Sequence, residues 1–171
     1  MLLAAEGVTI LRLGRLLTLH FFIGMLLVGP VALKAGSTIY RFARYYAGSA
    51  PYRRKGPPAP LLRLLGPVVM ITSLTVLGTG VMLAIMGPSG AGTWLFLHRA
   101  SFILWFGAMT VHVLAYLPRL PGLVAAESRG AAVLGGRGVR LSLLLASLVA
   151  GLVIAMLTVH LAGPWHFGRS G

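Results

Sequence analysis

The run WLFLHRASFILWFGAMTVHVLAYL, residues Trp94 to Leu117, is long and apolar enough to cross a membrane as one helix. Its flanks are typical of helix ends, because the turn sequence GPSGAG precedes it at 87–92 and Pro118 follows it. The run also contains two histidines, His98 and His112. It therefore predicts a transmembrane helix that carries titratable side chains.

Three more apolar runs of similar length predict further transmembrane helices. They are LLTLHFFIGMLLVGPVAL at 16–33, LLRLLGPVVMITSLTVLGTGVMLAIM at 61–86 and VRLSLLLASLVAGLVIAMLTVHLA at 139–162. Pro30 predicts a kink in the first, although the helical pattern continues past Lys34 as far as Tyr46. Of the 171 residues, 57% are hydrophobic and 10% are charged, and the runs leave no room for a soluble domain. We therefore expect one membrane domain over 1–171, an all-α antiparallel four-helix bundle.

The basic residues predict how this bundle is oriented. They gather in two of the three connections, 34–60 and 118–138, whereas the connection at 87–93 has no Lys or Arg. The positive-inside rule places both basic loops in the cytoplasm and both chain termini on the extracytoplasmic side of a cytoplasmic (inner) membrane. Arg12 and Arg15 oppose this assignment weakly. Because topology already accounts for the formal charge of +13, we expect no nucleic-acid partner.

The composition also excludes several kinds of chemistry. Only Glu6 and Glu127 are acidic, so a hydrolase built on paired carboxylates lacks its parts. The chain has no cysteine, which excludes thiolate nucleophiles, iron–sulfur clusters and cysteine-ligated zinc. The five histidines remain as the main chemical resource.

The spacing of His98 and His112 is typical of two stacked cofactor ligands. The two residues lie 14 positions apart. At about 100° and 1.5 Å per residue, they share a helix face and are about 21 Å apart along the axis. Two histidines so placed suit two b-type haems, each bound by imidazoles from facing helices. Buried histidines that bond only to neighbouring carbonyls, or a proton path, are the alternatives.

His20 and His160 are the candidate partners from other spans. Counted from the basic flank of each span, His20, His98 and His160 all lie 20 or 21 residues away, at the outer level. A tilt or a kink at Pro30 would lower His20 and give the favoured pairs, His98 with His160 outside and His20 with His112 inside. Two alternatives stay open: a single outer haem, and an inner haem with Met70 as second ligand.

Two further residues are candidates at the outer level. Arg99 follows His98 directly and would either pair with a haem propionate or extend to the lipid headgroups. His166 follows Pro164 in the outer tail and is a candidate contact for a quinone or a partner protein.

The stretch LHRASFILWFGAMTVHVLAYLPRLP at 97–121, with LTLHFFIG at 17–24 and MLTVHLAG at 156–163, resembles bacterial four-helix membrane b-type cytochromes. That family includes cytochrome b561 and the gamma subunits of formate dehydrogenase and hydrogenase. The resemblance implies haem b, a quinone and a redox partner subunit, with His20, His98, His112 and His160 as axial ligands. This sequence departs from the family in carrying its paired histidines on the third helix and none on the second.

Together these features predict an electron-transfer subunit of an oxidoreductase complex, which passes electrons between quinone and a partner protein and catalyses no bond chemistry alone. Two other functions remain open on the same residues. One is a histidine-lined carrier of protons or metal ions. The other is a haem-free structural subunit.

Overall fold

A computed structural model describes residues 2–49, 60–119, 121–122 and 137–167, and the described chain is almost entirely helical. The short helix α1 spans Leu2–Leu11, and four long segments follow it. These are α2 (Leu13–Tyr46), α4 (Pro60–Met86), α5 (Ala91–Tyr116) and α7 (Arg137–Thr158). Shorter turns complete the fold: η1 (Pro88–Gly90), η2 (Leu117–Arg119), η3 (Val159–Ala162) and α8 (Pro164–Phe167).

The four predicted spans are confirmed as four helices that are long and apolar enough to cross a membrane. The first span, at 16–33, lies within α2, and the predicted continuation of this helix past Lys34 as far as Tyr46 is also confirmed. Helical backbone angles continue through Pro30, and the departure from them in α2 lies at Leu16. Part of the expected basic loop 34–60 is thus helix. Residues 50–59, and 120 and 123–136 in the second expected loop, lie outside the described residues.

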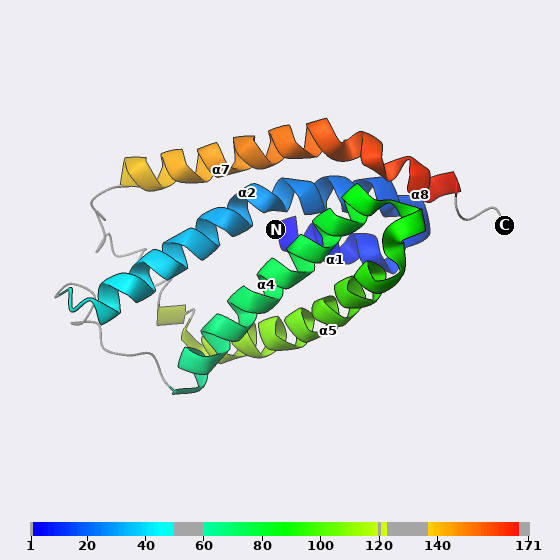
Figure 1. Ribbon diagram of the computed structural model, residues 1–171. Helices are drawn as coiled ribbons and strands as arrows, with labels where there is room; N and C mark the ends of the chain where they lie inside the picture. The colour runs from blue at the N-terminus through cyan, green and yellow to red at the C-terminus, as the bar shows by residue number, and fades with distance from the viewer. Residues whose placement is uncertain (1, 50–59, 120, 123–136, 168–171) are drawn as a thin grey trace.

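Successive long helices run in opposite directions (Figure 1). Helices α4 and α5 form a hairpin whose turn uses Gly87 at a positive φ of 67°, a conformation that favours glycine. Helix α2 packs mainly on α7, and α1 folds back along α2 on the side of α4 and α5. The α1–α2 junction, the α4–α5 turn and the end of α7 therefore lie at one end of the molecule (Figure 1). We call it the junction end.

Glycines let α2 and α7 approach each other closely. A Cβ at Gly151 would collide with the carbonyl group of Leu26, and a Cβ at Gly29 would collide with that of Ser147. The Leu26 carbonyl lacks its usual helical donor, because the residue four positions later is Pro30. Backbone contact between small residues is the usual way in which membrane helices gain packing energy. The nearby core consists of Met25, Ala84 and Ala155.

A side-chain hydrogen bond joins α4 to α5. The Trp105 Nε1–H donates to Ser73 Oγ at 2.9 Å. The Ser73 hydroxyl in turn donates to the Val69 carbonyl at 2.6 Å.

We expect Trp105→Phe to destabilise the folded protein by about 0.6 kcal/mol through this bond, the average for such bonds between membrane helices. The measurement is unfolding by SDS of Trp105→Phe, Ser73→Ala and the double variant, because the cycle isolates the coupling between the two side chains. Strictly additive effects would contradict the assignment.

Most large apolar side chains on the long helices face outward. Phe96 is 70% exposed, Ile103 and Leu157 are each 68% exposed. A protein in water rarely leaves such a surface uncovered. Together with the length and hydropathy of the helices, this exposure indicates a multi-pass membrane protein.

Candidate functional site

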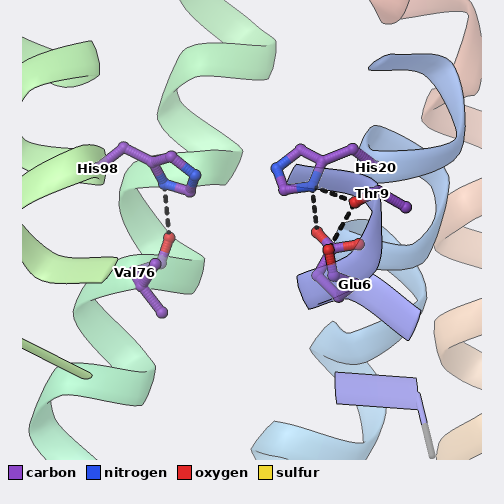
Figure 2. A network of polar contacts seen from close by, with 5 residues as sticks. All are labelled: Glu6, Thr9, His20, Val76 and His98. Carbon is purple, nitrogen blue, oxygen red and sulfur yellow. Dashed lines mark hydrogen bonds and ion pairs between the residues drawn. The ribbon is translucent and has the colours of Figure 1, made fainter. Parts of the chain in front are cut away.

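Two of the four predicted histidine ligands face each other at the junction end. The ring centroids of His20, from α2, and His98, from α5, lie 6.4 Å apart, and the ring planes meet at 77°. Figure 2 shows that each ring directs its Nε2 atom toward the other ring and its Nδ1 atom away from it. Among the described residues, these two rings are the ones arranged most like two ligands of one metal ion.

The Nδ1 atom of His98 is held by helix α4. It lies 3.0 Å from the Val76 carbonyl oxygen and 3.2 Å from Thr79 Oγ1. A carbonyl oxygen can only accept, so Nδ1 carries the proton and donates it. Gly80 makes this approach possible, because a Cβ there would lie 3.2 Å from Cε1 of the His98 ring. In the neutral ring, Nε2 is then left with its lone pair.

The Nδ1 atom of His20 is held by helix α1. It lies 2.9 Å from Thr9 Oγ1 and 3.0 Å from Glu6 Oε1 (Figure 2). The Thr9 hydroxyl donates its single proton to the backbone carbonyl of Glu6 at 2.6 Å, so toward His20 it can only accept. His20 therefore also carries its proton on Nδ1, and its Nε2 also presents a lone pair.

Glu6 is the only charged residue in the otherwise mostly apolar helix α1, LLAAEGVTIL. Burial raises the pKa of Glu6 to about 8. Its Oε2 atom is buried and has no hydrogen-bond partner among the described residues.

A metal ion or a hydrogen-bond donor placed between two facing lone pairs would interact favourably with both of them. Since an imidazole nitrogen binds a transition-metal ion at about 2.0 to 2.1 Å and lies about 1.1 Å from its own ring centroid, two rings sharing one ion in line have centroids about 6.3 Å apart. The observed 6.4 Å matches this spacing. The ring spacing is therefore compatible with one metal ion between the two Nε2 atoms.

The observed pair differs from the pairs favoured by the sequence, which were His98 with His160 and His20 with His112. The equal depth of His20 and His98 agrees with their contact. His20 cannot also reach His112, because His112 lies 14 positions after His98 in α5, about 21 Å away along the helix axis. No compensating kink occurs at Pro30, where backbone angles stay helical.

The remaining candidates differ in their burial and contacts. His160 is exposed in η3. His112 stacks at 4.9 Å on the Tyr116 ring, and its Nδ1 is buried without a hydrogen-bond partner among the described residues. Arg99 is exposed beside His98, while Thr18 Oγ1 lies 2.9 Å from Nε2 of the exposed His166.

Sequence reasoning missed Glu6 and Thr9 as neighbours of His20. A signal was present, because an acid in an otherwise apolar segment calls for a buried partner. Nothing in the local sequence indicates that α1 folds back along α2, which is what brings Glu6 to the His20 ring.

Comparisons of the chain with protein-family models, curated proteins and solved structures gave no match. The functional assignment accordingly depends on the residues and geometry described above.

Proposed function

We propose that the protein is a membrane b-type cytochrome subunit in which His20 and His98 are the axial ligands of one haem. The observation that supports it is the pair of facing Nε2 lone pairs, held at the spacing of two imidazoles on one metal ion. Each ring is oriented by a hydrogen bond from its Nδ1–H, as histidine ligands usually are.

The number of protein donors favours haem over a bare metal ion. Protein sites for bare transition metals commonly combine three or four donor side chains. Within the described residues, no group of three or more His, Cys, Asp or Glu side chains is placed to hold a metal ion. Haem needs only two axial ligands from the protein, because the macrocycle supplies the other four.

The surrounding residues have clear roles in this proposal. Bound haem would supply a one-electron ferric/ferrous couple. As its ligands, His20 and His98 would set the midpoint potential of the haem and the depth at which it is buried. Exposed cations for the propionate groups are available at the junction end, from Arg12, Arg15 and Arg99. A second haem on His112, and ligation by His160, remain predictions from the sequence.

We propose the same topology as the sequence predicts: an antiparallel four-helix bundle in a cytoplasmic membrane, with the junction end outside. Exposed Lys34, Arg41 and Arg44 near the opposite end support that orientation. The site then lies near the outer surface and would exchange electrons between quinone in the bilayer and a redox partner subunit.

The test is a dithionite-reduced minus oxidised spectrum of protein purified after expression with ample haem. Pyridine haemochrome then measures the stoichiometry. We expect a low-spin haem b at one per chain. Two per chain would add a haem on His112. No haem would overturn the proposal.

The rival function is proton or metal-ion transport through the same side chains. Glu6, His20 and His98 form a chain of titratable groups, and a water molecule between the rings could replace the metal ion. That function predicts proton flux or divalent-metal uptake in liposomes of haem-free protein. A purely structural subunit predicts neither flux nor haem, and only a stability change in His98→Ala.

A further inference from the structure

The two histidines of the proposed haem site are held in different ways. His98 is held by a backbone carbonyl of α4, its neighbour in the same hairpin. His20 is held by two side chains of α1, which precedes the four long apolar helices. Thr9 is only 2% exposed, so its hydroxyl is committed to this contact and to the Glu6 carbonyl.

We propose that α1 is a positioning helix for the His20 ligand, in which Glu6 and Thr9 hold the ring as the Nδ1–H tautomer with Nε2 directed at His98. The inference rests on the proposed function and adds a residue role to the same site. It assigns a purpose to an otherwise costly feature, a carboxyl group in an apolar helix whose Oε2 atom is buried.

The geometry of α1 suits this role. Arg12 makes the turn between α1 and α2 with non-helical backbone angles, and the chain folds back so that Glu6 and Thr9 face the first turns of α2. Gly24, one turn after His20, leaves room for the acid, because a Cβ there would lie 3.2 Å from Glu6 Oε1. Both acceptors thus reach the same nitrogen from one side.

Hydrogen bonds of this kind make the imidazole a stronger donor to the metal, and removing them typically weakens metal binding by about 10- to 100-fold. We therefore expect the variant that combines Glu6→Ala with Thr9→Val to bind haem about 10- to 100-fold more weakly. We also expect its midpoint potential to rise, because a poorer donor stabilises ferric iron less. Redox titration and haem titration of the purified protein measure both quantities.

Conservative variants distinguish a role in orienting the His20 ring from a general effect on folding. Glu6→Gln keeps an acceptor oxygen and Thr9→Ser keeps the hydroxyl, so both should restore the potential of the unmodified protein. Thr110→Val is the matched control, since the exposed Thr110 hydroxyl donates only to the Phe106 carbonyl of its own helix. An unchanged potential in the double variant, or no rescue by the conservative variants, would overturn the proposal.

A measurement without haem distinguishes this inference from the proposed function. Nitrogen NMR of haem-free protein with labelled histidine, assigned with His20→Gln, should show His20 protonated at Nδ1. The combined Glu6 and Thr9 variant should lose that preference. If the unmodified protein shows the tautomer and yet binds no haem, the proposed function fails while the positioning role stands. If the protein binds haem but His20 shows no Nδ1–H preference, the positioning role fails alone.

Discussion

Replacement of His98 by alanine is expected to remove the low-spin haem, with affinity falling by about 100-fold or more, since an axial ligand contributes more than its hydrogen-bonded neighbours. His20→Ala should have the same effect, because both rings face the same point. The measurement is haem content and the reduced-minus-oxidised spectrum of each purified variant.

Added imidazole should restore the spectrum of His98→Ala. The small ligand can occupy the vacated volume and donate its own N–H to the Val76 carbonyl, which accepts from His98 in the unmodified protein. Rescue would show that the variant folds and lacks only its ligand. His160→Ala is the control, because the His160 side chain is exposed and the proposed haem site does not use it. Loss of the haem in His160→Ala but not in His20→Ala would instead support the pairing favoured by the sequence.

The second large effect concerns helix packing. Gly151→Ala is expected to destabilise the protein by about 1–3 kcal/mol, the usual cost of adding volume to a packed interface. The physical reason is direct, since the new methyl group would occupy the position of the Leu26 carbonyl on α2. Helix α7 would have to move away from α2 along their shared face.

At a matched glycine, replacement by alanine is expected to change the stability in the opposite direction. A Cβ at Gly78, within α4, would meet nothing within 4 Å. Glycine is also less favourable than alanine in a helix by roughly 0.5–1 kcal/mol, so Gly78→Ala should be neutral or stabilising. SDS unfolding of both variants tests the contrast. Equal effects at the two positions would contradict the close contact between α2 and α7.

Local sequence was sufficient for the helices and, to within a few residues, for their limits. The span at 94–117 is found as α5 from Ala91 to Tyr116, because a long apolar run bounded by glycine and proline has few other structures available in a membrane. The first helix was predicted to continue as far as Tyr46, where α2 ends, because the polar residues after Lys34 end the apolar run without ending the helix. Helical hydrogen bonding continues wherever the backbone allows it, whatever the hydropathy.

The candidate site was predictable in its residue types and depth. His98 was recognised from its position in a membrane span, and counting residues placed His20 at the same level, where the structure has it. The pairs favoured by the sequence, which assumed that a kink at Pro30 lowers His20, differ from this contact. Backbone angles at Pro30 remain helical, so the depth obtained by simple counting was the better guide.

The sequence by itself determined the four apolar helices and the histidine content of each, because hydropathy and helix length are local properties. Only the tertiary structure decided that His20 faces His98, since that contact depends on the rotation and packing of α2 against the α4–α5 hairpin. It likewise decided that α1 folds back and brings Glu6 and Thr9 to the His20 ring. Such contacts follow from the shapes of the packed surfaces, here including Gly24 and Gly80, and no short segment of the chain encodes them alone.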